Sequence, residues 1–261
     1  MTLQKAMLKV LLLSLPMTLL ALGCCKISLP PMPVLHPTPT PGPVGQPTQG
    51  PVTDQFCGEI SARGTHFSAF DDFSFASNPV PDGAWRYGYT TVLGGTFNLY
   101  SFKGTFYYQP DPSIPLSMWL MAEGQIDPNV NKNETGSDIY ANTGEWVYLP
   151  AQTYLNFHPG PNGEISVVRW ICPAAGNYKI DSAFRSLRVG GPATTTDIHV
   201  LLNNAPVFNG IINAHYADGE FPYSANLAFH ACDTLDFAVG RGENNEYSYD
   251  SSGIRATIDR E

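Results

Sequence analysis

Apolar and polar residues alternate along several short segments of the chain. In residues 178–185, for example, Tyr178, Ile180 and Phe184 alternate with charged or small side chains. Because successive side chains of a strand point to opposite faces of a sheet, this alternation predicts strands with one buried face. The same alternation recurs in three further segments, residues 197–202, 235–239 and 254–258.

Other segments refine this pattern. Residues 165–171 are apolar on both faces apart from Ser166 and Arg169, which predicts a central strand. Asn203-Asn204 lies between two apolar segments and predicts a hairpin turn, because Asn tolerates positive φ angles. Residues 127–136 predict a long polar loop. No stretch of twelve residues carries a helical apolar stripe between good caps. We therefore predict an all-β fold, a single antiparallel β-sandwich or jelly-roll domain over residues 52–261.

The first 23 residues have the layout of an export signal. Lys5 and Lys9 precede an apolar run over 10–22, which is shorter than the roughly 20 apolar residues of a transmembrane helix. The stretch LALGC at 20–24 resembles the lipobox of bacterial lipoproteins, which implies that Cys24 is acylated after cleavage of residues 1–23. An ordinary secretory signal is the alternative. We expect an exported protein, lipid-anchored at the cell surface or outer envelope, whose contact with the membrane is the lipid alone.

Residues 24–51 predict an extended tether. Nine prolines lie between residues 27 and 51, with almost no large apolar side chain that could form a core. Such a segment rises about 3.1 Å per residue as a polyproline II helix. The tether would hold the sandwich domain away from the membrane.

Charge narrows the range of partners. Without residues 1–23 the chain carries 12 Lys and Arg against 23 Asp and Glu, and its basic residues do not cluster. Phosphate binding requires clustered cations, so nucleic acid is not an expected partner.

Three cysteines lie in the predicted domain, at positions 57, 172 and 232. We predict a disulfide between Cys172 and Cys232, since both lie at the ends of predicted strands, and leave Cys57 free. No Cys-x-x-Cys spacing indicates a thiolate metal site. We expect no cofactor, although a structural calcium is an open alternative because several side chains could supply oxygen ligands, namely Asp197, Asp236, Asp250 and the asparagines of 129–133.

Several motifs together resemble a β-sandwich domain that recurs in exported bacterial proteins, often ones with a PEP-CTERM sorting tail. The motifs are DGAWRYGY at 82–89, HPG at 158–160, VVRW at 167–170, PAAGNY at 173–178, TTDIHV at 195–200, DTLDF at 233–237 and YSYDSSG at 247–253. They are also similar, more loosely, to the jelly-roll modules attached to polysaccharide-degrading enzymes. The resemblance covers about residues 67–259 and implies a β-sandwich rather than a particular activity.

Aromatic residues suggest a binding site. Trp85, Tyr87 and Tyr89 occupy alternate positions, so their rings would share one face of a strand, as a row on which a sugar chain can stack. The segment 243–250 adds amides, carboxylates and rings of the kind that bind sugar hydroxyls. Its predicted ligand-binding residues are Asn244, Tyr247, Tyr249 and Asp250. Burial of the rings in the core is the structural alternative, and we assign Trp170 to the core.

Catalysis has less support than binding. No nucleophile elbow, zinc-protease motif or phosphate-binding loop occurs. The sequence favours a non-catalytic, lectin-like lipoprotein that binds a polysaccharide. Two alternatives remain: a structural or adhesive surface domain, and a polysaccharide lyase or hydrolase on the same fold.

Overall fold

The computed structural model describes Cys57 and residues 64–107, 115–141 and 147–261. The predicted signal, Cys24 and the predicted tether at 24–51 lie outside the described residues. Within the described part of the chain, no helix has the length and apolarity needed to cross a membrane.

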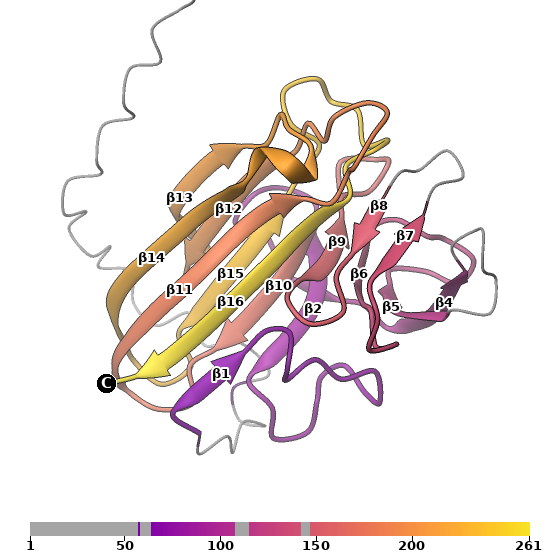
Figure 1. Cartoon of the computed structure of the whole chain (residues 1–261). Coiled ribbons are helices and arrows are strands. Elements are labelled where there is room, and N and C mark those ends of the chain that lie inside the picture. The colour runs from indigo at the N-terminus through magenta and orange to yellow at the C-terminus, as the bar shows by residue number, and fades with distance from the viewer. Residues whose placement is uncertain (1–56, 58–63, 108–114, 142–146) are drawn as a thin grey trace, which may run out of the picture. The chain divides into compact units, whose positions relative to one another are not determined.

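The described residues form an antiparallel β-sandwich, as predicted (Figure 1). The first sheet has the order β14-β11-β16-β9-β6-β5-β4, and β1 pairs with β16. Its strands are β14 (Glu220–Phe229), β11 (Gly176–Ser186), β16 (Ser252–Arg260), β9 (Leu155–His158), β6 (Asn129–Lys132), β5 (Pro115–Leu120), β4 (Phe102–Tyr107) and β1 (His66–Ser68).

The second sheet has the order β13-β12-β15-β10-β2-β3. Its strands are β13 (Ala205–Ile211), β12 (Asp197–Leu202), β15 (Thr234–Val239), β10 (Ile165–Ile171), β2 (Trp85–Thr90) and β3 (Asn98–Leu99). A separate hairpin of β7 (Ile139–Ala141) and β8 (Val147–Leu149) lies beside the sandwich, and a short 3-10 turn, η2 (Tyr216–Asp218), lies between β13 and β14 (Figure 1).

The core lies between the two sheets and is rich in aromatic rings. Trp170 makes edge-to-face contacts with Phe67, Tyr178 and Phe229, at centroid distances of 5.5, 5.1 and 5.2 Å. Such offset geometries are the arrangement that aromatic quadrupoles favour. Trp170 is fully buried, so its assignment to the core is confirmed.

The predicted alternation is confirmed where one face of a strand meets this core. The four alternating segments lie within β11, β12, β15 and β16, and the central strand at 165–171 is β10, between β15 and β2. Asn203 and Asn204 form the β12–β13 hairpin with φ angles of 49° and 66°, as predicted.

The predicted polar loop at 127–136 is wrong in its middle, because Asn129–Lys132 is strand β6. The side chains of Asn129 and Asn131 are buried there. Asn131 Nδ2 donates to Asn129 Oδ1, and Asn129 Nδ2 donates to Asp127 Oδ1, both at 2.8 Å. Amides that bond to one another tolerate burial, so this polar sequence forms an internal strand.

The predicted Cys172–Cys232 disulfide is also wrong. The structure joins Cys57 to Cys232, with their Cα atoms 5.3 Å apart, and leaves Cys172 as a buried thiol. Cys172 does lie beside Cys232, since Cys232 N–H donates to the Cys172 carbonyl at 2.8 Å, but its side chain belongs to the core cluster. Burial raises the pKa of the Cys172 thiol, which keeps it protonated and unreactive.

The outer face of the second sheet is partly covered as well. Phe97, Val167, Leu201 and Ala238 form a small apolar cluster there. Next to it, Arg169 on β10 faces Asp236 on β15 as its direct cross-strand neighbour. Both side chains are at least 94% buried, and the guanidinium binds the carboxylate through two hydrogen bonds of 2.7 and 2.8 Å.

Candidate functional site

The predicted row of rings on β2 does not reach the surface. Trp85 and Tyr87 share one face of the strand, as predicted, but that face points into the core, and their exposed fractions are 1% and 0%. Trp85 packs against Phe237, and Tyr87 packs against Phe73. Tyr89 is half-buried and stacks on Tyr100 at 5.7 Å. Trp85 and Tyr87 are therefore core residues, and the prediction that they bind a ligand is wrong.

The second predicted segment does lie at the surface, in the connection between β15 and β16. We call residues 240–251 the rim loop. It is fixed to the residue two positions before β12: Asn244 Nδ2 donates to Thr195 Oγ1 at 2.7 Å, and Thr195 N–H donates to Asp250 Oδ1 at 2.9 Å. The rim loop is therefore held against the start of β12 and is not a free surface loop.

Asp250 anchors the rim loop from inside. Its side chain is fully buried, and burial raises the pKa of its carboxyl to about 6. Oδ1 accepts hydrogen bonds from Thr195, whereas Oδ2 has no partner. A buried carboxyl with one unpaired oxygen favours the neutral, protonated form. Asp250 therefore positions the rim loop and does not face solvent as a ligand-binding residue.

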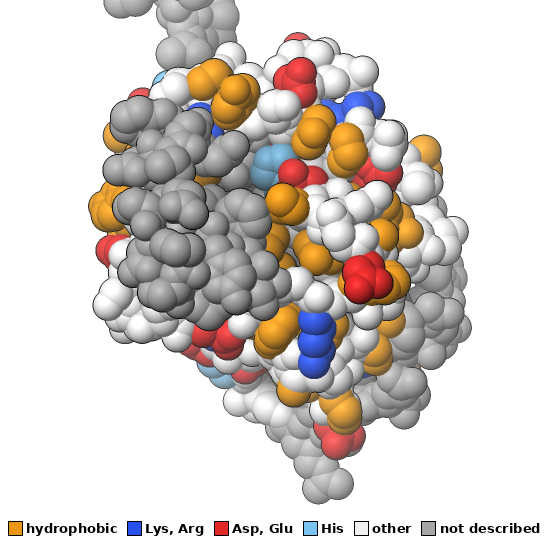
Figure 2. All heavy atoms as spheres, turned by 90° about the vertical axis from the view of Figure 1, so that its right-hand side faces the viewer, with side chains coloured by type: hydrophobic (Ala, Val, Ile, Leu, Met, Phe, Trp, Pro, Cys, Tyr) orange, Lys and Arg blue, Asp and Glu red, His pale blue; other side chains and the backbone are white. Residues whose placement is uncertain are grey.

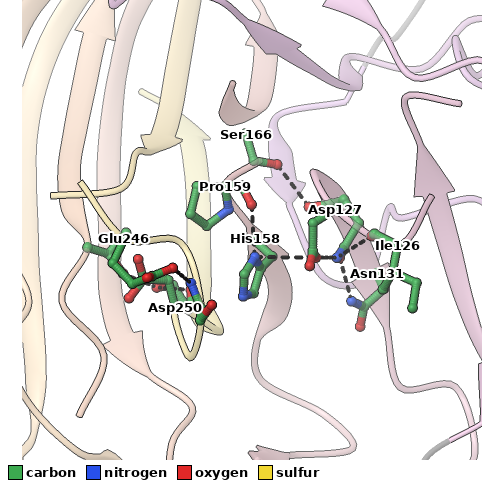
Figure 3. Close-up of polar contacts among 12 residues, drawn as sticks. Ile126, Asp127, Asn131, His158, Pro159, Ser166, Glu246 and Asp250 are labelled. Atoms are coloured by element: carbon green, nitrogen blue, oxygen red, sulfur yellow. Dashed lines mark hydrogen bonds and ion pairs between the residues drawn. The ribbon is translucent and has the colours of Figure 1, made fainter. Parts of the chain in front are cut away.

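His158, the last residue of β9, lies between the rim loop, with Glu246 and Asp250, and Asp127 of the β5–β6 connection (Figure 3). Its Nδ1 lies 2.9 Å from the Pro159 carbonyl oxygen and 3.3 Å from Asp127 Oδ1, so this nitrogen carries a proton. The ring of Tyr247 meets the imidazole edge-on at 6.2 Å. Because only 8% of His158 is exposed, this cluster is a structural junction that orients Tyr247.

A solvent-open hollow of about 480 Å³ lies over the outer face of β12 and β13, beside the rim loop. We call it the rim hollow. It is lined by Asp197, His199, Asn209, Gly210, Ile211, Gly242 and Glu243. Two elements thus build it: the β12–β13 hairpin supplies the floor, and the rim loop supplies one wall.

A row of three hydrogen-bonded side chains crosses the floor of the rim hollow. His199 Nε2 lies 2.7 Å from Asp197 Oδ2, and His199 Nδ1 lies 2.6 Å from Asn209 Oδ1. Asp197 and His199 alternate on β12, and Asn209 is the direct cross-strand neighbour of His199 on β13. The strand period of two therefore puts all three side chains on one face.

The protonation of this row follows from its geometry. Both ring nitrogens of His199 face oxygen atoms, so the protonated ring can donate a hydrogen bond at each nitrogen. Burial lowers the pKa of His199, but the hydrogen bonds to Asp197 and Asn209 outweigh it and leave that pKa raised. Burial raises the pKa of Asp197, but the hydrogen bonds from His199 and the Gly242 N–H outweigh it and leave that pKa lowered. The pair is thus ionised between pH 4 and 6.5, the window between the unperturbed pKa values of Asp and His.

Two glycines let the carboxylate of Asp197 lie directly on the rim loop. Gly242 N–H donates to Asp197 Oδ1 at 2.6 Å, with Gly242 at a φ of +65° that favours glycine. A Cβ atom on Gly240 would collide with the same carboxylate. The Asp197 side chain is therefore fixed in place on two sides, while 32% of it stays exposed.

The sequence contained part of this site. The alternation over residues 197–202 places Asp197 and His199 on one strand face, and residues 243–250, which form most of the rim loop, were predicted as a binding segment. No sequence pattern marks Asn209 and Ile211 as site residues, because they reach the site only through the pairing of β13 with β12.

No metal site was found among these residues. Within the described ranges, no three His, Cys, Asp or Glu side chains gather in a way that could hold a metal ion. The three carboxylates named as possible calcium ligands each bind a separate partner: Asp197 binds His199, Asp236 binds Arg169, and Asp250 binds Thr195.

No protein-family model and no curated protein sequence matches the chain. Solved structures do match its fold. CBM51 from Clostridium perfringens GH95 in complex with methyl-galactose is 12% identical, with a TM-score of 0.34, over 62% of this chain and 94% of that one. A family 35 carbohydrate binding module from Clostridium thermocellum is 13% identical, with a TM-score of 0.27, over 47% and 87%. Rabbit GITRL is 9% identical, with a TM-score of 0.26, over 36% and 70%. At such scores, function has to be argued from the residues of this chain.

Proposed function

We propose that the chain is a non-catalytic carbohydrate-binding protein and that the rim hollow is its binding site. The observation that carries the proposal is the row of Asp197, His199 and Asn209, fixed by internal hydrogen bonds and open to solvent beside the rim loop. A binding site gains affinity when its polar groups are oriented before the ligand arrives. The side chains of Asp197, His199 and Asn209 are already held in place by their hydrogen bonds to one another when no ligand is bound.

The free hydrogen-bonding capacity of the row matches sugar hydroxyls. Each oxygen of Asp197 accepts one internal bond and keeps a further lone pair, so the carboxylate can accept from hydroxyl groups. Asn209 uses its Oδ1 internally, which leaves its amide N–H groups as donors. Beside them Ile211, 47% exposed, offers an apolar surface to the C–H groups of a sugar ring. Acceptor, donor and apolar contact in one hollow suit a polyhydroxylated ring.

Charge narrows the class of sugar. The hollow combines two carboxylates, Asp197 and Glu243, with one histidine, His199, which carries at most one positive charge. Its net negative charge disfavours uronic acids and other anionic glycans. We expect an uncharged glycan.

The same geometry argues for binding rather than catalysis. A general base needs a free lone pair, and both nitrogens of His199 already lie within hydrogen-bond distance of an oxygen of this chain. The lowered pKa of Asp197 makes it a poor proton donor near neutral pH. Neither group is therefore free to move a proton to or from a bound sugar.

A glycan array probed with the protein, followed by calorimetry, tests this function. Asp197→Asn keeps the shape of the side chain but removes its charge, and charge-assisted hydrogen bonds are worth about 1.5–3 kcal/mol. We expect affinity for the best glycan to fall about tenfold or more.

Asp259→Asn is the matched control, because Asp259 also binds a histidine, His66, at 2.6 Å but lies on β16, which is not part of the rim hollow. Its affinity should equal that of the wild-type protein. If no glycan binds, or if both variants lose affinity equally, the assignment is wrong and a structural or adhesive role is favoured.

We also propose that Cys24 carries a lipid that anchors the protein at the cell surface or outer envelope. The support is the resemblance of residues 20–24 to a lipobox, after a basic start and an apolar run. Cys24→Ala should move the protein from the detergent phase to the aqueous phase in a Triton X-114 partition. Unchanged partitioning of that variant would exclude the anchor.

A further inference from the structure

Three tyrosines from separate segments meet on the outside of the first sheet. Tyr140 on β7 and Tyr148 on β8 are direct cross-strand neighbours with ring centroids 4.6 Å apart. Tyr216 of η2 meets Tyr148 edge-on, also at 4.6 Å. We call these three residues the tyrosine platform. None of them was singled out from the sequence, because they come together only through the packing of the β7–β8 hairpin.

The hairpin that carries the tyrosine platform is firmly attached. Tyr148 N–H donates to the Leu187 carbonyl at 2.8 Å, just after β11 ends, and Tyr216 N–H donates to the Arg188 carbonyl at 2.6 Å. Beneath the hairpin, Val147 and Leu187 belong to one buried apolar cluster, with Leu116, Met118, Leu120, Ile139 and Leu149. The rings therefore lie on a fixed base.

Two rings of the tyrosine platform are held by neighbouring groups, and the third is open. Tyr148 O–H donates to Asp138 Oδ2 at 2.6 Å. The guanidinium of Arg185 lies 3.8 Å from the centre of the Tyr216 ring and donates to the Tyr216 carbonyl. Tyr140, in contrast, is 59% exposed. The platform therefore supports one open ring with two oriented ones.

We infer that the tyrosine platform is a second carbohydrate-binding surface, which takes the apolar face of an uncharged pyranose ring on Tyr140. Tyrosine offers a flat apolar face with a polar edge, and a pyranose offers a C–H face with hydroxyls at its edge. Asp138 stands beside the rings as an acceptor for those hydroxyls. The hydrogen bond from Tyr148 lowers the pKa of Asp138, so the carboxylate is ionised. The site shares no residue with the rim hollow.

Size and charge favour a sugar over larger partners. A specific protein interface buries on the order of 800 Å² on each side, whereas a fully exposed aromatic side chain offers only about 150–250 Å². Two of the three tyrosines are half-buried, so the platform falls well short of that area. Nucleic acid is disfavoured, because Asp138 binds Tyr148 and Asp218 lies in η2, where their carboxylates repel phosphates, while the Arg185 guanidinium is engaged with Tyr216. Figure 2 faces the side on which β7 and β8 lie in Figure 1, and shows Asp and Glu scattered among hydrophobic side chains with few Lys or Arg.

The test measures binding of uncharged gluco-, galacto- and manno-oligosaccharides of two to six residues by calorimetry. It uses the full chain in the wild-type and Asp197→Asn backgrounds. Tyr140→Ala should weaken binding about fivefold or more in both backgrounds, whereas Tyr140→Phe, which keeps the ring face, should restore it. Phe102→Ala, which removes another exposed ring, at 40%, is the control and should leave binding unchanged.

Thermal unfolding of each variant shows whether the fold is kept, and Tyr140→Phe keeps the test decisive if Tyr140→Ala proves unstable. Loss of binding in Asp197→Asn alone, with full affinity in Tyr140→Ala, would overturn the platform while leaving the rim hollow standing. Loss in Tyr140→Ala alone would support the platform and contradict the rim hollow. A change from dimer to monomer in Tyr140→Ala, measured by light scattering, would show a self-association surface and also overturn the inference.

Discussion

Trp85→Ala is expected to destabilise the domain by about 3–5 kcal/mol, the usual cost of removing a buried large aromatic side chain. Trp85 is 1% exposed and packs in the core against Phe237, which lies on β15 of the same sheet. Its indole N–H donates to Asp72 Oδ2 at 3.2 Å, so the substitution also removes one of the two hydrogen bonds that this oxygen accepts, the other coming from Ser68 N–H. A single domain typically has only about 5–15 kcal/mol of stability, so the variant should be close to unfolding.

Urea denaturation followed by tryptophan fluorescence and circular dichroism measures this effect. Phe102→Ala serves as the comparison, because it removes a 40% exposed ring and should change stability by less than about 1 kcal/mol. A Trp85→Ala protein that keeps its stability but loses glycan binding would return Trp85 to the surface and show that this description of the core is wrong.

Arg169→Met is expected to cost about 3–5 kcal/mol, because it leaves the carboxylate of Asp236 buried without its partner. Arg169 binds Asp236 through two hydrogen bonds of 2.7 and 2.8 Å, and its guanidinium also lies 4.2 Å from the centre of the Phe97 ring. The loss comes mainly from the uncompensated charge rather than from the attraction that the pair supplied.

The double variant Arg169→Met/Asp236→Leu separates these two terms. Replacing both partners by apolar side chains leaves no buried charge, so the double variant should recover most of the stability that the single one loses. Urea denaturation of the two single variants and the double variant completes a double-mutant cycle. Equal stability of Arg169→Met and the wild-type protein would show that water reaches Asp236, and a double variant as unstable as the single would show that the pair itself is worth several kcal/mol.

Much of the sandwich could be predicted from the sequence, because each strand carries its own period of two. The alternation of apolar and polar residues does not show which face of a strand meets the core. Trp85 and Tyr87 share a face, but only the packing of β2 against the facing sheet decides that this face is the inner one. The same limit applies to Asn129 and Asn131, whose burial depends on hydrogen bonds to each other and to Asp127.

The predictions of the disulfide and of the binding site were wrong for a related reason. The positions of Cys172 and Cys232 at strand ends were predicted correctly and do lie side by side, but the direction of the Cys172 side chain into the core removes it from pairing. The alternation over residues 197–202 is enough to place Asp197 and His199 on one strand face, whereas Asn209 could be added only once the register of the β12–β13 hairpin was known. Contacts between segments far apart in the sequence leave no local pattern.

The central claim is that the rim hollow binds an uncharged glycan. Its most direct measurement is an NMR titration of the protein with the best array glycan, following the imidazole resonances of His199 and the side-chain amide of Asn209. The account predicts that these signals shift in a saturable way and that Asp197→Asn weakens the response about tenfold, since the carboxylate is the main acceptor. Saturable glycan binding that leaves the His199 and Asn209 signals unmoved would contradict it.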